Sequence, residues 1–379
     1  MFRKGILNLI VAIFLAACAA AGTPTSSAEP VKFGLAVGLT GYLAQLDGQL
    51  TDGAKLAADF INRQGGVLGR RLELVVVDMA SDPQQGVQAV QRLITRDGVD
   101  VVLGGFSSAS TAASAPVVAA SRKPMLVASI LPSPQPEWVF STIPPAEFET
   151  AVRVDYLKSV GARSVGVLYD TTPYAALQLE IVRGQLSRAG IELVGAEKHG
   201  TDATDLRAQL ASLLDRKPEA LLKFGAGPTN IVAAKGLKQL GATVPLLMSI
   251  DDLSTYAQAY AEYPNIMFAA APPQVYKELE RPSKALTDFI DIWTKGGRQG
   301  DPVYSGRGWD AVFLAANAVN KAGTTDGEKV RVAFEDMEPY EGTSATYKFT
   351  RNNHYGIREN PMVLARFEGN SAKIVYRPR

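Results

Sequence analysis

A run of hydroxyl side chains follows a short apolar segment about a quarter of the way along the chain. The apolar residues 99–103 end at Gly104-Gly105, and Phe106 then precedes Ser107-Ser108-Ala109-Ser110-Thr111 and an alanine-rich stretch. This pattern predicts a buried strand, a turn and a helix that begins inside the hydroxyl run. The first turn of a helix has unpaired backbone N–H groups and the positive end of the helix dipole, so it binds carboxylates and phosphates well.

Two interpretations of the hydroxyl run are open. Serine and threonine are common helix N-caps, and the run could serve that purpose alone. One hydroxyl is enough for a cap, however, and four of these five residues carry one. We therefore favour an anion-binding site at this helix start and keep the plain cap as the alternative.

The composition excludes several classes of partner. The chain has 379 residues, with 39 basic and 38 acidic side chains. Nucleic acids and anionic membrane surfaces select strongly basic patches, so a nearly neutral chain argues against both as partners. The length fits about two domains.

The first 28 residues have the features of an export signal. Arg3 and Lys4 precede an apolar run over residues 6–17, which is shorter than the roughly 20 residues of a membrane-spanning helix. Leu15-Ala16-Ala17-Cys18 matches a lipobox, in which cleavage precedes Cys18 and the thiol carries a lipid. The alternative is ordinary cleavage after Ala28. Both interpretations place the protein in the periplasm or on the outer face of the cytoplasmic membrane.

Metal and nucleophile chemistry have little material in this chain. Cys18 is the only cysteine, and the two histidines, His199 and His354, stand far apart in polar contexts. We expect both histidines to lie on the solvated surface. No metal site, no His-dependent triad and no cofactor is predicted.

Short apolar runs alternate with amphipathic segments from residue 31 onward. The first series has expected strands at 32–37, 72–77, 99–103 and 125–128, with helices at 53–63, from Pro83 after the cap Asp82, and from the hydroxyl run. The second series has strands at 164–169, 191–194, 220–224, 245–249 and 266–270, with helices at 147–159, 174–189, 205–215 and 230–240. Helices at 284–295, 308–321 and 328–337 follow, and a tail of strands at 345–349, 361–367 and 373–376 closes the chain.

Continuous apolar strands that are each followed by a helix indicate parallel sheets covered on both faces. Two such series predict an α/β protein with two doubly wound lobes.

Several motifs, in this order and spacing, resemble those of a known family. They are Leu39-Thr40-Gly41, Gly65-Gly66-Val67-Leu68-Gly69-Arg70-Arg71-Leu72-Glu73-Leu74 with Asp78 and Asp82-Pro83, the segment 104–111, and Gly308-Trp309-Asp310-Ala311. The chain resembles the periplasmic substrate-binding proteins of branched-chain amino-acid (Leu/Ile/Val-type) ABC transporters, from residue 31 to the C-terminus.

The resemblance implies two α/β lobes joined by three crossovers, with the ligand in the cleft between them. The crossovers are expected near 141–145, 270–273 and 341–345. Lobe 1 would then comprise residues 31–143 and 272–342, and lobe 2 residues 144–271 and 343–379. A monomer that captures a small molecule and delivers it to the membrane permease of an ABC transporter is implied.

The resemblance also implies ligand-binding residues in lobe 1. Ser108 matches the position whose hydroxyl and amide bind the ligand's carboxylate, and Phe106 and Ser107 flank it. Ser129 matches a second wall position, followed here by Ile130 and Leu131 where the family usually has a Ser-Ala-Thr run. Leu46 stands where an aromatic residue often packs on the ligand, and Tyr42 nearby could supply a ring instead.

In lobe 2 the resemblance implies Tyr174, Gly227 and an aspartate. Tyr174 fits a ligand-binding tyrosine, with packing on the lobe as the alternative, and Gly227 falls where another tyrosine is common. Asp251 or Asp252 falls near the acid that pairs with the ligand's ammonium group. The alternative is a plain helix cap.

Two ligand hypotheses follow from these departures. The first is an aliphatic or aromatic amino acid, and the second is an aromatic or other apolar carboxylate that lacks an amine. A sensor domain and an NAD-dependent enzyme are the other classes considered. Gly225-Ala226-Gly227 follows an expected strand, as a dinucleotide fingerprint would, but Asn230 stands where the third glycine belongs. The enzyme is therefore disfavoured.

Overall fold

The computed structural model describes residues 29–298, 301–369 and 371–378. The expected export signal, the lipobox and Cys18 lie outside these residues. Within the described part of the chain, no helix has both the length and the apolar character required to cross a membrane.

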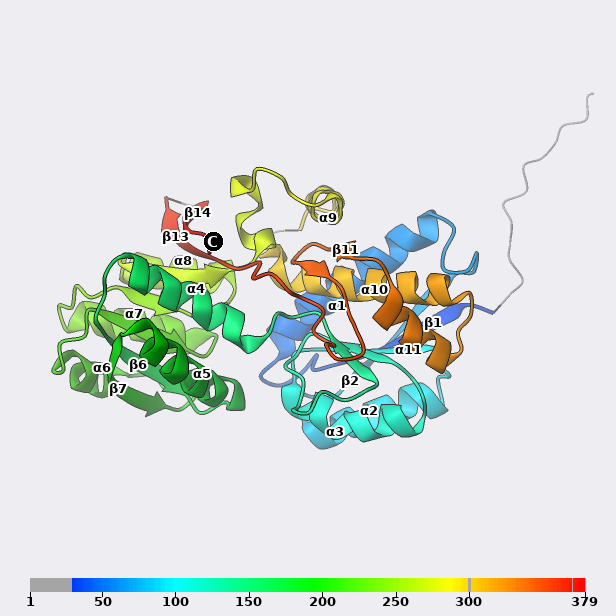
Figure 1. Ribbon diagram of the computed structural model, residues 1–379, viewed down its shortest axis with the longest axis horizontal. Helices are drawn as coiled ribbons and strands as arrows, with labels where there is room; N and C mark the ends of the chain where they lie inside the picture. The colour runs from blue at the N-terminus through cyan, green and yellow to red at the C-terminus, as the bar shows by residue number, and fades with distance from the viewer. Residues whose placement is uncertain (1–28, 299–300, 370, 379) are drawn as a thin grey trace, which may run out of the picture.

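The first lobe is built on a five-stranded parallel sheet (Figure 1). Its order is β2-β1-β3-β4-β5, with β1 (Val31–Val37), β2 (Leu72–Asp78), β3 (Val101–Gly104), β4 (Met125–Val127) and β5 (Val139–Ser141). Four of these strands confirm the sequence prediction. The sequence did not predict β5, because three residues are too short for a periodic signal.

Six helices accompany this sheet. They are α1 (Ala44–Arg63), α2 (Pro83–Thr95), α3 (Ser108–Ala120), α9 (Lys284–Lys295), α10 (Pro302–Ala322) and α11 (Gly327–Asp336). The predicted start of α2 is confirmed, because the Asp82 carboxylate accepts the backbone N–H groups of Gln84 and Gln85, both at 2.9 Å. Helix α1 begins at Ala44 rather than at residue 53, with no side-chain cap.

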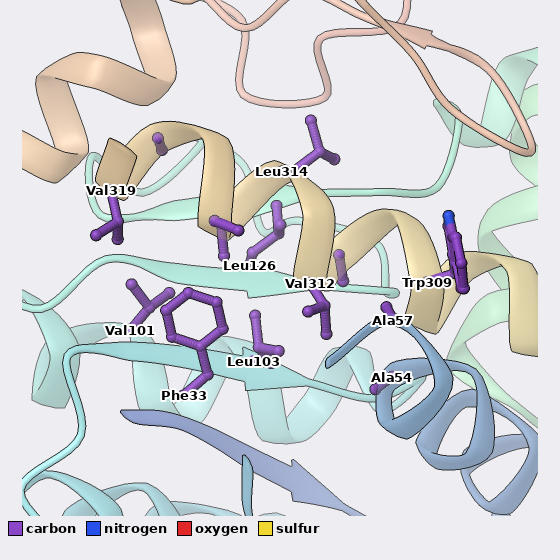
Figure 2. Packing of buried hydrophobic residues seen from close by; sticks show 14 of the residues in the cluster. Phe33, Ala54, Ala57, Val101, Leu103, Leu126, Trp309, Val312, Leu314 and Val319 are labelled. Atoms are coloured by element: carbon purple, nitrogen blue, oxygen red, sulfur yellow. The ribbon is translucent and has the colours of Figure 1, made fainter. Parts of the chain in front are cut away.

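The core of the first lobe lies between the sheet and α10. Figure 2 shows α10 over the strands, with Val312 close to Leu103. Trp309 is buried at the other end of the same cluster. Burial of these apolar side chains gives the lobe its main stabilising term.

The second lobe has a seven-stranded sheet in the order β14-β13-β10-β9-β8-β6-β7. Its strands are β6 (Ser164–Asp170), β7 (Glu192–His199), β8 (Ala220–Phe224), β9 (Leu246–Met248), β10 (Ile266–Ala270), β13 (Val363–Glu368) and β14 (Ser371–Tyr376). Its helices are α4 (Ala146–Ser159), α5 (Pro173–Ala189), α6 (Arg207–Leu214), α7 (Pro228–Gln239) and α8 (Leu253–Glu262). All pairs are parallel except those that β13 and β14 make. Separate apolar clusters lie on its two faces.

The return of the tail to the second lobe comes later than expected. Short strands β11 (Tyr340–Glu341) and β12 (Thr346–Tyr347) pair beside the first lobe. Tyr347, Phe349 and Ile357 are buried in the first lobe's core, and the Tyr347 hydroxyl donates to Asp310 at 3.0 Å. The predicted lobe boundary at residue 343 is therefore corrected to the segment between Ile357 and Val363, because these side chains need the first lobe's apolar core.

The prediction that both histidines are solvated is wrong. His354 is 3% exposed, stacks on Phe140 with ring centroids 4.2 Å apart, and turns Nδ1 to the carbonyls of Pro136 and Val139. His199 is 4% exposed at the end of β7. Polar neighbours in sequence did not reveal this burial, since it results from tertiary packing.

Candidate functional site

A small apolar cluster joins the two lobes. Leu46 of α1 and Phe106 of the loop after β3 belong to the first lobe, and Ile250 follows β9 of the second. They pack against Ala271, Val303 and Tyr304, and we call these six residues the interlobe cluster. The Phe106 and Tyr304 rings meet edge to face, with centroids 5.2 Å apart. Because ligands of open α/β sheets bind beyond the carboxyl ends of the strands, this region is the candidate site.

The start of α3 shows that the hydroxyl run has two separate uses. Ser107 is the N-cap, since its Oγ accepts the backbone N–H of Ser110 at 3.1 Å. Ser108 is half-buried, and its Oγ accepts the backbone N–H of Ile130 at 3.2 Å. No acceptor for the Ser108 hydroxyl hydrogen lies within hydrogen-bonding distance among the described residues. The plain-cap interpretation thus accounts for Ser107 and leaves Ser108 as a donor at the helix N-terminus.

The segment after β4 is only partly available to a ligand. Ser129 is buried, and its Oγ lies 2.7 Å from that of Thr111. Its carbonyl accepts the Ser141 hydroxyl at 2.8 Å. Ile130 is half-buried, whereas Leu131 is 5% exposed within the core of the first lobe. The structure therefore places Leu131 in the core instead of in the expected pocket wall, because its side chain packs beneath the sheet edge.

Sequence reasoning missed Asp47, which connects two loops of the site. Its Oδ2 accepts the backbone N–H of Gly38 at 2.6 Å, and its Oδ1 accepts that of Phe106 at 2.9 Å. Burial raises the pKa of Asp47 to about 6, although both hydrogen bonds act to lower it. The available signal was its position in α1, four residues after the buried Leu43 and therefore on the same face.

Tyr42 lies outside the interlobe cluster. Its side chain is 71% exposed on the loop after β1. The same loop is held by Asp78, which accepts the Leu39 N–H at 2.9 Å and the Thr40 hydroxyl at 2.8 Å. The loop is therefore well anchored while the Tyr42 ring faces solvent.

Tyr174 directs its hydroxyl into the second lobe. It lies in the first turn of α5, and its OH donates to the Glu149 carboxylate. Glu149 also accepts the Ile250 N–H at 2.9 Å and pairs with Arg153 at 3.3 Å. Burial and the Glu149 charge raise the pKa of Tyr174 well above its usual value. The structure thus places Tyr174 as a link between α5 and Glu149, with its ring half-buried.

The Asp251 carboxylate is fully engaged within the second lobe. It accepts the Gly227 N–H at 2.6 Å, the Asn230 side-chain amide at 2.8 Å and the Asp252 N–H at 2.8 Å. Burial raises the pKa of Asp251 to about 6 against these bonds. Asp251 therefore fixes the loop that contains Gly227. A carboxylate on this loop repels phosphate, which argues against dinucleotide binding there.

Asp252 is both a helix cap and a contact between lobes. Its Oδ1 accepts the Ser254 N–H at 2.8 Å at the start of α8, which confirms the cap interpretation. Its Oδ2 accepts the side-chain amide of Gln49 from α1 at 3.1 Å. Of the two adjacent aspartates, Asp252 is the one that contacts the first lobe.

Asp301 connects both lobes beside this contact. Its carboxylate accepts the backbone N–H of Leu253 at 2.7 Å, the Gln274 amide at 2.7 Å and the Val303 N–H at 2.8 Å. Burial raises the pKa of Asp301 to about 7, and the charge of Asp252 adds to this shift. In the residues that the structure describes, no group of three His, Cys, Asp or Glu side chains could hold a metal ion.

Comparison with known proteins assigns the family. A model of the family described as periplasmic binding protein matches residues 30–372. The chain belongs to this family. An amino acid binding protein of Pseudomonas aeruginosa is 27% identical over 345 residues, which cover 87% of each chain. The leucine-, isoleucine-, valine-, threonine-, and alanine-binding protein of the same organism is 25% identical, over 87% of this chain and 89% of the relative.

The fold of this periplasmic binding protein also matches solved structures. An extracellular ligand-binding receptor from Rhodopseudomonas palustris superimposes with a TM-score of 0.82 at 19% identity, over 91% of this chain and 99% of the other. The two-lobed α/β fold and the resemblance to Leu/Ile/Val-type binding proteins are thus confirmed. The named curated relatives are binding proteins, as expected for a chain that is not an enzyme.

Proposed function

We propose that this chain is an extracytoplasmic solute-binding protein that captures a small organic acid between its lobes. The single observation that carries the proposal is Ser108, whose oxygen is held by the Ile130 N–H while its hydrogen has no acceptor. A ligand carboxylate would accept that hydrogen and lie at the N-terminus of α3. The charge of the carboxylate and the helix dipole favour the same position.

The apolar part of the ligand would contact the interlobe cluster. Leu46, Phe106 and Ile130 approach from the first lobe, and Ile250 approaches from the second. Amino acids are the first class to test, because relatives over most of the chain are named for binding them. Since the cluster takes residues from both lobes, a bound ligand would stabilise the closed arrangement.

Binding to the purified protein tests the proposal. Isothermal titration with the twenty amino acids and with aliphatic and aromatic carboxylates would identify the class, and Ser108→Ala would then test the site. Loss of a hydrogen bond to a charged group costs about 1.5–3 kcal/mol, so we expect affinity to fall roughly 10- to 150-fold. Ser121→Ala, at the other end of α3, is the matched control. Unchanged binding in Ser108→Ala would refute the assignment.

The transport role has its own test. The family supports periplasmic transport, and delivery to an ABC permease is the proposed next step. Vesicles that contain the cognate permease should take up the ligand only when this protein is added. Mass spectrometry of the mature protein would distinguish lipidation at Cys18 from cleavage after Ala28.

A further inference from the structure

The Gln49–Asp252 pair is a side-chain hydrogen bond that crosses between the lobes. Gln49 lies on α1 of the first lobe, and Asp252 caps α8 of the second. The Gln49 amide nitrogen must face the carboxylate, because the amide oxygen would be repelled by it. This bond therefore fixes the orientation of the amide, and the Gln49 Oε1 atom lies on the side away from Asp252.

Gln49 Oε1 is buried and has no hydrogen-bond partner in the described part of the chain. A buried polar atom without a partner costs about 1–3 kcal/mol. The fold thus keeps an acceptor at the lobe boundary that only a donor from outside the described residues would satisfy.

This acceptor lies beside the interlobe cluster. Leu46 is one helical turn before Gln49 on the same face of α1, and Ile250 is two residues before Asp252. A ligand that packs on Leu46 and Ile250 therefore approaches the Gln49–Asp252 pair from both lobes. Ser108 is two residues from Phe106 on another side of the same cluster.

The charges around the pair favour a cation. Asp251, Asp252 and Asp301 gather here, and the Asp252 charge adds to the burial that raises the pKa of both other acids. Lys223 is the buried cation that interacts with Asp251. Additional positive charge next to Asp252 would lower the electrostatic cost of the acidic group.

We propose that Gln49 Oε1 and the Asp252 carboxylate form a subsite that accepts the ammonium group of the ligand. Gln49 contacts the ammonium, and Asp252 orients the amide and supplies the negative charge. Asp251 takes no part, because its carboxylate already accepts three donors of its own lobe. The inference rests on the proposed function and specifies its ligand as an amino acid.

Matched ligands separate this subsite from the carboxylate site. L-leucine and L-phenylalanine are each compared with the corresponding 2-hydroxy acid and with the acid that has no substituent at that carbon. Isothermal titration of the wild type should show the amino acid bound at least 10-fold more tightly than the unsubstituted acid. In Gln49→Leu this preference should disappear, while affinity for the unsubstituted acid stays within about 3-fold.

Two controls exclude a general structural effect. Gln45→Leu changes an exposed residue one turn earlier on α1 and should keep the preference. Thermal unfolding of Gln49→Leu must show a folded protein, and Asp252→Asn, which keeps a cap oxygen, should also reduce the preference.

The proposal is overturned if Gln49→Leu still prefers the amino acid, or if the wild type binds the unsubstituted acid equally well. Equal affinity for the hydroxy acid would overturn the ammonium assignment in favour of a neutral donor. If none of the carboxylates binds the wild type, the proposed function itself fails and this subsite with it. Binding of only the unsubstituted acids would instead keep the proposed function and reject the subsite.

Discussion

The close approach of α1 to α10 gives a sharp test of how the site is positioned. A Cβ added at Gly53 of α1 would lie 1.7 Å from the carbonyl oxygen of Ser305 in α10. The same contact seen from α10 involves Gly308, where a Cβ would lie 1.9 Å from the Leu50 carbonyl oxygen. The two helices therefore pack backbone to backbone, and Gly53→Ala should force them apart.

The size of the effect follows from these distances. A methyl group needs roughly 3.5 Å from a neighbouring heavy atom, so the helices would separate by about 1.8 Å. Overpacking of this kind costs about 1–3 kcal/mol and occasionally more, and the shift also weakens the dispersion contacts along both helices. Alanine regains about 1 kcal/mol of helix propensity. We expect the free energy of unfolding to fall by about 2–4 kcal/mol.

Urea unfolding followed by circular dichroism measures this change. Gly48→Ala is the matched control, because it lies on the same helix with nothing within 4 Å of the added Cβ. It should stabilise the protein by about 0.5–1 kcal/mol. A Gly53→Ala variant within 1 kcal/mol of the wild type would refute the packing argument. Gly53→Ala should also weaken ligand binding, since Leu46 and Gln49 lie on the displaced helix.

Three further changes have defined outcomes. Lys223→Met should lower the free energy of unfolding by about 3–5 kcal/mol in urea, because it leaves the nearby Asp170 and Asp251 without their buried cation; a loss below 1 kcal/mol would contradict this. Asp47→Asn should cost about 1–3 kcal/mol in the same assay, because an amide oxygen cannot replace both carboxylate bonds, and an unchanged midpoint would argue against it. Asp301 has a pKa of about 7 in the folded state against 3.8 as its ordinary value, so the folded state holds this proton more tightly. Its contribution to stability is therefore lost as the pH rises towards about 7, and Asp301→Asn should remove that decline, by at most about 1.4 kcal/mol per pH unit; parallel curves for wild type and variant at pH 5–8 would refute it.

Local signals in the sequence predicted much of the architecture. Asp82 followed by Pro83 fixed the start of α2, and the left-handed Gly190 ends α5. These signals work because capping and backbone freedom act within a few residues. Continuous apolar strands followed by helices predicted the parallel sheets, since only strands buried on both faces have that pattern.

The sequence was less informative where a short segment depends on a distant partner. The strand β5 has only three residues and is recognisable only beside β4. The polar contexts of His199 and His354 suggested exposure, whereas other elements bury both. Tyr347 and Phe349 stay with the first lobe because the aromatic core around Phe140 is there.

By itself, the sequence determined the α/β class, the two series of elements and the hydroxyl run at the start of α3, since each is encoded by neighbouring residues. Only the tertiary structure decided how the candidate site is divided. It assigned Ser107 to the cap and Ser108 to the unused donor, engaged Asp251 within its own lobe, and brought Asp252 to Gln49, 203 residues away in the chain. Those roles depend on which hydrogen-bonding groups remain unpaired after folding, and that is a property of the packed molecule.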